Sequence, residues 1–217
     1  MAAHAELILV IGDKNLSSWS MRPWLAMRAA GIPFREVKIL LDQKNTAAKI
    51  KQYSPSGRVP LLVHGGIKIW DSLAICEYLA ETFKNHSLWP ADKSDRAFAR
   101  SIAAEMHSSF QSLRSQLSMD IRLRTEIRHL TSSTEEDISR IVELWAQCLK
   151  KSSGPFLLGE FGIVDAFYAP VVFRFVSYGI KVKNRKIVQY MKSMQNHPSV
   201  KEWVKEAKKE KPKVKIY

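Results

Sequence analysis

Cysteine is scarce in this sequence of 217 residues, and long apolar runs are missing. Cys76 and Cys148 each lie inside an apolar stretch, which favours buried thiols over a disulfide or a nucleophile and fits a reducing, cytoplasmic location. No apolar run approaches the ~18–20 residues that a membrane helix needs, so we expect no membrane partner. The opening MAAHAEL has no basic segment ahead of an apolar core, so we expect no secretory signal.

Acidic residues are few relative to basic ones. Lysine and arginine number 34 against 21 aspartates and glutamates, a formal net charge of +13. Such an excess first suggests nucleic acid as a partner. The basic residues are spread out, however, and their densest part, Lys201–Lys215, contains three glutamates and lacks the aromatic–basic alternation that stacks bases. We therefore expect a solvated basic face and tail and no nucleic-acid partner.

The first third of the chain alternates strand and helix patterns. Two apolar runs separated by Gly65-Gly66 predict a hairpin, and Pro23 is tolerated if it falls in the first turn of its helix. The predicted elements are, in order, a strand at 6–11, a helix from Ser20, a strand at 34–41, a helix at 46–53, strands at 59–63 and 67–70, and a helix opening at Asp71-Ser72. This βαβαββα order predicts a mixed four-stranded sheet with helices, an α+β unit.

The remainder of the chain has purely helical periodicity. The predicted helices are one long helix from Phe98 to Leu117, a helix opened by a capping box at Thr134 and Asp137 and continuing through 138–149, a buried helix at 164–178, and helices at 187–194 and 200–207. The polar, proline-containing segment 86–91 separates the two patterns. We predict an N-terminal domain at 1–85 and an all-helical domain at 92–217.

The stretch KNLSSWSMRPW crowds hydroxyls ahead of the first helix. Capping a helix needs one serine, yet Ser17, Ser18 and Ser20 all lie there. A hydroxyl at a helix N-terminus can donate a hydrogen bond to a thiolate, and the helix dipole also favours the charged sulfur. Trp19 occupies the place where a cysteine would be sought, so the sulfur would have to arrive with a ligand.

Two further pairs of residues suit an extended ligand. Val59-Pro60 begins a strand, and an open strand edge can pair with a peptide backbone, although the proline alone would also explain a turn. Asp71-Ser72 opens a helix, whose free N–H groups attract a carboxylate while Asp71 can pair with an ammonium. Capping of that helix is the simpler explanation, and it needs only one of the two residues.

A second group of polar residues follows the first long predicted helix. His107, Gln111 and Arg114 recur at spacings of four and three, so they would share one face. Arg22, in the first helix, would point toward the same place. An imidazole, an amide and guanidinium groups would suit an anionic or carbonyl-bearing electrophile. A solvated polar stripe would explain the same spacing.

Three stretches carry a resemblance to the cytosolic glutathione transferases, namely NLSSWSMRPWLAMRAAGIPF, SPSGRVPLLVHGGIKIWDSLAICEYLAE and FGIVDAFYAPVVFRF. The resemblance covers nearly all of the chain and is of a bacterial type. It implies a thioredoxin-like N-terminal domain, an all-α C-terminal domain, a homodimer and no metal. It implies glutathione as co-substrate, with cis Pro60, the Val59 backbone on the cysteinyl unit and Asp71 and Ser72 on the γ-glutamyl end. The remaining glutathione-binding residues that it implies are Ser17, Trp19 and Arg58.

The segment SSWSMR is similar to the SSCSxR motif of the zeta class, which makes Ser17 the expected thiol activator and Ser18 the alternative. Trp19 stands where that motif has cysteine. This difference argues against a zeta-type isomerase that acts on maleylacetoacetate. Gly162 stands where the family usually has a serine or threonine cap before its central helix, while Asp165 is kept. We expect conjugation of glutathione to a hydrophobic electrophile, with the isomerase or a non-catalytic binding protein as alternatives.

Overall fold

The computed structural model describes residues 6–41, 43–84 and 86–210. The predictions made for the opening segment and for the end of the basic tail, residues 211–215, fall outside these ranges. The elements are β1 Leu7–Ile11, α1 Ser18–Ala29, β2 Arg35–Lys38, α2 Thr46–Tyr53, β3 Leu61–His64, β4 Ile67–Trp70, α3 Ser72–Thr82, α4 Lys93–Ser108, α5 Gln111–Gln116, α6 Ser132–Lys151, α7 Ile163–Ser177, α8 Arg185–Asn196 and α9 Pro198–Lys209.

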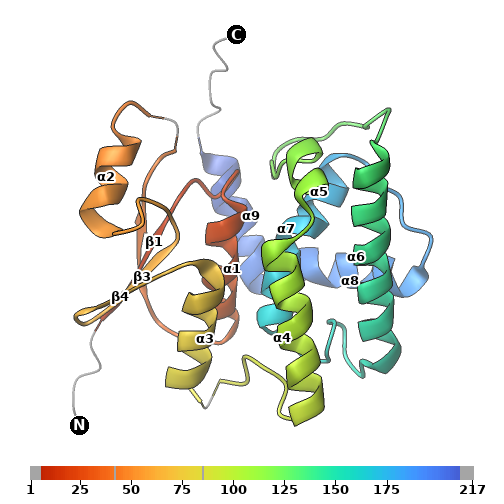
Figure 1. Ribbon diagram of the computed structural model, residues 1–217, viewed down its shortest axis with the longest axis horizontal. Helices are drawn as coiled ribbons and strands as arrows, with labels where there is room; N and C mark the ends of the chain where they lie inside the picture. The colour runs from red at the N-terminus through yellow and green to blue at the C-terminus, as the bar shows by residue number, and fades with distance from the viewer. Residues whose placement is uncertain (1–5, 42, 85, 211–217) are drawn as a thin grey trace.

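The four strands form one mixed sheet in the order β2-β1-β3-β4 (Figure 1). Strand β1 pairs parallel with β2 and antiparallel with β3, and β3 pairs antiparallel with β4 across the glycine turn. The βαβ crossover through α1 makes the first pair parallel, because parallel neighbours need a long connection. The predicted mixed sheet and hairpin are therefore confirmed.

The two faces of the sheet bury different residues of β1. Leu9 and Ile11 belong to the large core that also holds Trp24 of α1 and Ile75 of α3, whereas Val10 joins a smaller cluster with Ile50 of α2. Alternate residues of a strand point to opposite faces, so a single short strand supplies both clusters. Helix α2 thus covers one face of the sheet, and α1 and α3 cover the other.

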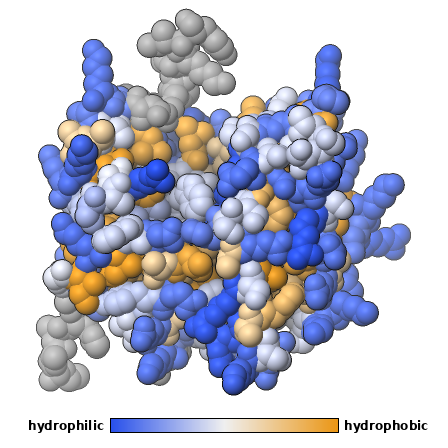
Figure 2. All heavy atoms as spheres, viewed as in Figure 1, coloured by the Kyte–Doolittle hydropathy of each residue, from blue (hydrophilic) through white to orange (hydrophobic). Residues whose placement is uncertain are grey.

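The helical half packs around α7, whose residues are almost all buried, as the apolar run at 164–178 predicted. Helix α7 contacts α1, α4 and α8, so the sheet half and the helical half meet at α1 (Figure 1). On the face shown in Figure 2, hydrophobic side chains gather over the strands, and hydrophilic ones cover most of the helical half. The proposed boundary at 86–91 falls between α3 and α4.

The predicted single helix from Phe98 to Leu117 is wrong. It is divided into α4 and α5 by Ser109 and Phe110, and Phe110 has a left-handed backbone conformation with φ of 63°. Met106 of α4 and Leu113 of α5 are both buried, so the apolar spacing continues across the break. The break also means that His107 and Arg114 do not share one helical face.

The predicted cap of α6 is also misplaced. Thr131, rather than Thr134, is the N-cap, and its Oγ1 accepts a hydrogen bond from the Thr134 N–H. Asp137 does not close a capping box there, because its Oδ2 accepts from the Leu113 N–H at 2.9 Å. The Asp137 carboxylate, on α6, is instead the hydrogen-bond acceptor for a free N–H group in the first turn of α5.

Both cysteines are free and buried, as predicted. Burial raises the pKa of the Cys76 thiol far above its usual range and that of Cys148 to about 12. Within the described ranges, none of the helices has the length and apolar character to cross a bilayer.

Asp165 holds the segment that leads into α7. Its Oδ1 accepts from the Leu157 N–H at 3.1 Å, and its Oδ2 accepts from the Gly162 N–H at 3.0 Å, so a glycine precedes the helix while the acid supplies the cap. Asp165 is buried, and this burial raises the pKa of its carboxyl to about 7 despite the two hydrogen bonds.

We predict that Asp165 makes the protein less stable as the pH rises. The folded carboxyl binds its proton more tightly than the unfolded one, whose pKa is about 3.9, so its contribution is lost between about pH 4 and pH 7. Measured by urea denaturation, the wild-type free energy of unfolding should fall relative to that of Asp165→Asn across this window. Glu135→Gln is the control for removing one surface carboxylate, and a pH-independent difference between wild type and Asp165→Asn would contradict the prediction.

Candidate functional site

The N-terminus of α1 uses its three serines in different ways. Ser17 is the N-cap: its Oγ accepts from the Ser20 N–H at 3.4 Å and donates to the Ser20 Oγ at 2.8 Å. Ser20 is fully buried and also accepts from the Gly12 N–H at the end of β1. Ser18 Oγ accepts from Arg174 Nη2 at 3.4 Å. The helix starts two residues before the predicted Ser20, so Pro23 lies in its second turn rather than its first.

The loop before Ser17 is held by the far end of the chain. The Glu210 carboxylate accepts from the backbone N–H groups of Lys14 at 2.8 Å and Asn15 at 3.0 Å. The buried Lys14 ammonium is paired with Glu206 and, at 2.7 Å, with Glu36. It also lies over the rings of two tryptophans, Trp24 at 4.7 Å and Trp203 at 5.4 Å from the ring centroids. Helix α9 therefore fixes the loop that delivers the serines.

A pocket of about 440 Å³ lies between α1, the start of β3 and the start of α3. Its lining residues are Trp19, Ser56, Arg58, Val59, Pro60, Trp70, Asp71 and Ser72. The bond between Val59 and Pro60 is cis, as the resemblance implied. Sequence reasoning missed Ser56 and Trp70, although both lie within the second quoted stretch, and Trp70 directly precedes Asp71. The predicted Ser17 is not among the lining residues.

Asp71 occupies an unusual backbone conformation at one end of this pocket. Its φ is 76° and its ψ is 133°, a region that residues with a side chain rarely adopt. The Asp71 Oδ1 accepts from the Leu73 and Ala74 N–H groups and caps α3, so the capping role is real. The Oδ2 lies 3.2 Å from Nε2 of His107, on α4. A contact between the sheet half and the helical half thus reaches the pocket.

Three of the predicted second-substrate residues lie around the ring of Trp19. The Arg22 guanidinium lies 4.1 Å and that of Arg114 5.0 Å from the centroid of the Trp19 ring, and His107 meets the ring edge-on at 5.2 Å. The Trp19 side chain is 37% exposed and covers Arg22, which is fully buried. Gln111 is not brought to this group: it is exposed, and its Nε2 lies 3.5 Å from the Ser108 carbonyl oxygen.

Three guanidinium groups give this region a positive potential. Burial, with help from Arg114, lowers the pKa of Arg22 to about 9, and burial and the same neighbour lower that of Arg174 to about 10. Burial also lowers the pKa of Arg114. Within the described residues, the Nε and Nη2 of Arg22 and the Nε of Arg174 are buried without a hydrogen-bond partner. The arrangement favours a nearby anion.

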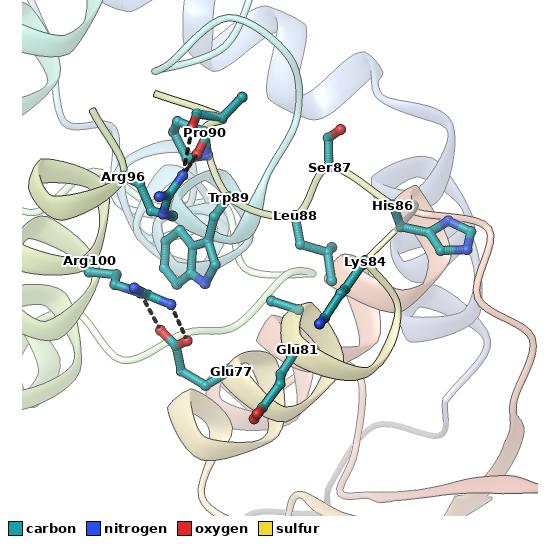
Figure 3. Close-up of a pocket in the computed structure, with 12 residues that line it drawn as sticks. Glu77, Glu81, Lys84, His86, Ser87, Leu88, Trp89, Pro90, Arg96 and Arg100 are labelled. Atoms are coloured by element: carbon teal, nitrogen blue, oxygen red, sulfur yellow. Dashed lines mark hydrogen bonds and ion pairs between the residues drawn. The ribbon is translucent and has the colours of Figure 1, made fainter. Parts of the chain in front are cut away.

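Another pocket, of about 510 Å³, lies at the opposite end of α3 (Figure 3). Arg100 of α4 makes a bidentate pair with Glu77 of α3, and Arg96 donates to the carbonyl oxygens of Pro90 and Ala91. Figure 3 shows the Arg100–Glu77 ion pair and the hydrogen bonds of Arg96 where the connection between the two halves crosses from α3 to α4. None of the predicted site residues lines this pocket. Among the described residues, no cluster of three or more His, Cys, Asp or Glu side chains is placed to hold a metal.

The sheet half has the thioredoxin-like arrangement, and the helical half completes a two-part fold. Two family models match the chain: "Glutathione S-transferase, N-terminal domain" over residues 16–82 and "Glutathione S-transferase, C-terminal domain" over residues 128–206. A similar relative is glutathione S-transferase 1 of Dianthus caryophyllus, 30% identical and aligned over 73% of each chain. The chain therefore belongs to the glutathione S-transferase family, as its motifs predicted.

The chain is also similar to proteins with other names. A probable maleylacetoacetate isomerase of Caenorhabditis elegans is 28% identical over 74% of each chain. The crystal structure of a glutathione transferase homologue from Burkholderia GL BGR1 with bound glutathione matches with a TM-score of 0.72. It is 24% identical and covers 94% of this chain and 98% of its own. An omega 3C glutathione transferase from Trametes versicolor has a TM-score of 0.71 at 21% identity, covering 97% and 92%. These structural matches support the two-part fold.

We predict that Glu210 stabilises the serine-bearing loop. Glu210→Ala leaves the Lys14 and Asn15 N–H groups without their acceptor and should lower the free energy of unfolding by about 1–3 kcal/mol. Glu210→Gln keeps one acceptor oxygen and should lose less. Urea denaturation measures both, and equal, negligible losses would show that the carboxylate does not hold the loop.

Proposed function

We propose that this protein binds glutathione in the 440 Å³ pocket and transfers it to an electrophile. The observation that carries the proposal is the pocket lining, which combines Val59 and cis Pro60 with Asp71 and Ser72 beside the N-terminus of α1. The pairing of β3 with β1 begins only at Leu61, which supports the proposal that the Val59 backbone pairs with an extended peptide. The start of α3 would receive the γ-glutamyl carboxylate, and Asp71 its ammonium.

The glutathione thiolate would be stabilised at the N-terminus of α1. Ser17 can accept from Ser20 and turn its own hydroxyl proton outward to the sulfur, since hydroxyl protons rotate. Ser18, whose oxygen accepts from Arg174, adds to the positive surroundings. In the reaction, the sulfur lone pair forms a C–S bond while the electrophilic carbon releases its leaving group, such as a halide.

The electrophile would bind beside Trp19. The ring, with Arg22 behind it and Arg114 next to it, offers an apolar surface in a positive field. This combination suits a hydrophobic or anionic electrophile. Gln111 is left out of the proposed set, because its amide lies against the Ser108 carbonyl.

We expect Ser17→Ala to lower conjugation to an aryl halide by about tenfold to a hundredfold, with little change in glutathione affinity. A hydrogen bond to a charged partner contributes about 1.5–3 kcal/mol, which is the basis of this range. Ser17→Thr keeps the hydroxyl and the cap and is the matched control. Ser18→Ala should cost less than Ser17→Ala; unchanged turnover in Ser17→Ala would remove Ser17 from the mechanism.

A glutathione-dependent isomerase is the second candidate. The arginine cluster favours a substrate carrying carboxylates, and one relative is named a probable maleylacetoacetate isomerase. In that reaction the thiolate would add to a conjugated double bond and leave again after rotation, so glutathione is regenerated. Isomerisation of a cis dicarboxylic alkene without consumption of glutathione would establish this activity in place of conjugation.

We also propose a homodimer in a reducing, cytoplasmic compartment. Strand β4 is an edge of the sheet, and Ile67 and Trp70 on it are 53% and 48% exposed. Exposed apolar residues on an edge strand are typical of association surfaces. Sedimentation velocity should give twice the chain mass, and Ile67→Lys should shift the protein toward the monomer. A wild-type monomer at all concentrations would contradict the proposal.

A further inference from the structure

Four polar side chains form a continuous chain of contacts between the two halves of the molecule. His107 Nε2 lies 3.2 Å from Asp71 Oδ2, and His107 Nδ1 lies 3.4 Å from Arg22 Nη1. The same Arg22 nitrogen donates to Ser72 Oγ at 3.3 Å. The contacts run from the first residue of the acid–serine pair through α4 and α1 and back to the second. His107 is the only member of the four that belongs to the helical half.

Arg22 determines which nitrogen of His107 carries the proton. A guanidinium has donors and no acceptor, so Nδ1 of the neutral ring must accept from Arg22. The ring proton is then on Nε2 and is donated to the Asp71 carboxylate. Burial lowers the pKa of His107, and its neighbours Arg22 and Arg114 lower it further against the opposing effect of Asp71, which keeps the ring neutral at pH 7. Each contact in the chain therefore has one defined direction.

The two oxygens of Asp71 have separate partners. Oδ1 is used by the backbone of α3, and Oδ2 by His107. The Leu73 and Ala74 N–H groups hold Oδ1, but these capping bonds involve only one of the two carboxylate oxygens. The side chain is 42% exposed, so it retains lone pairs for a ligand. His107, on α4, is the partner of Oδ2, so a second contact fixes the oxygen that the capping bonds do not hold.

We propose that His107 is a positioning residue for glutathione recognition: it holds the Asp71 carboxylate in the orientation that receives the γ-glutamyl ammonium. The inference rests on the proposed function and assigns His107 to the tripeptide rather than to the second substrate. His107 should therefore affect, through Asp71, the binding of one functional group of the ligand, the α-amino group. It should not affect the binding of the rest of the peptide. Helix α4 thereby contributes to a binding site whose lining residues all belong to the sheet half and α1.

The test compares glutathione with glutaryl-cysteinylglycine, which lacks only the α-amino group, by isothermal titration calorimetry at pH 7.5. His107→Phe keeps a ring beside Trp19 and Phe167 and removes both nitrogens. It should weaken glutathione binding by about three- to tenfold and change binding of the analogue by less than about twofold. His107→Gln can donate to Asp71 and accept from Arg22, and should restore most of the affinity for glutathione.

His129→Phe, the same change at an exposed position, is the matched control and should leave both affinities unchanged. If His107→Phe weakens both ligands equally, or neither, the positioning role is overturned while the proposed function stands. If the wild-type protein takes up neither ligand, the proposed function fails and the inference fails with it.

Discussion

Burial of α1 between the sheet and α7 is the constraint on which the rest of the structure depends. Met21, Trp24 and Leu25 are fully buried, and each such side chain contributes about 1.5–3 kcal/mol of hydrophobic stabilisation. A helix enclosed on two sides has almost no solvated face, so its polar residues must find partners inside the protein. Its N-terminus consequently lies in the crevice between the two halves. The buried serines and arginines of the site follow from this placement.

The same enclosure creates an electrostatic imbalance. Arg22, Arg114 and Arg174 approach one another where water is largely excluded, and the mutual repulsion adds to the cost of burial. Asp71 is the carboxylate that partly offsets Arg22. An anion bound beside Trp19 would relieve this repulsion, so ligand binding and stability of the crevice are linked. The formal net charge of +13 therefore says little about the local positive potential that these three arginines create beside Trp19.

Local patterns in the sequence predicted the parts of the fold that depend on neighbouring residues. The glycine hairpin, the buried run of α7 and the helix start at Asp71 follow from turn chemistry and periodicity, while the cis bond at Pro60 came from the family resemblance. The break at Phe110 could not be predicted, because the apolar spacing continues through it. The cap at Thr131 was missed because Asp137 is used by α5.

Site residues were predictable to the extent that they lie in contiguous motifs. The lining from Arg58 to Pro60 and at Asp71 and Ser72 was identified, together with Trp19. The contacts that orient them join residues far apart in the sequence, such as Arg174 with Ser18, and no pattern in one chain reports such pairs. Gln111 shows the reverse case: its spacing matched, but its exposed amide lies against the Ser108 carbonyl oxygen and not beside Trp19.

The hydrogen bond from the Lys14 N–H to the Glu210 carboxylate joins positions that are 196 residues apart in the sequence. During synthesis on the ribosome, the sheet half emerges first and can form its strands, yet its serine loop lacks the carboxylate that fixes it until α9 has been made. The N-terminal loop of α1 therefore gains this contact only after the helical half has been synthesised, so the two ends of the chain must both be present before the loop is fully held.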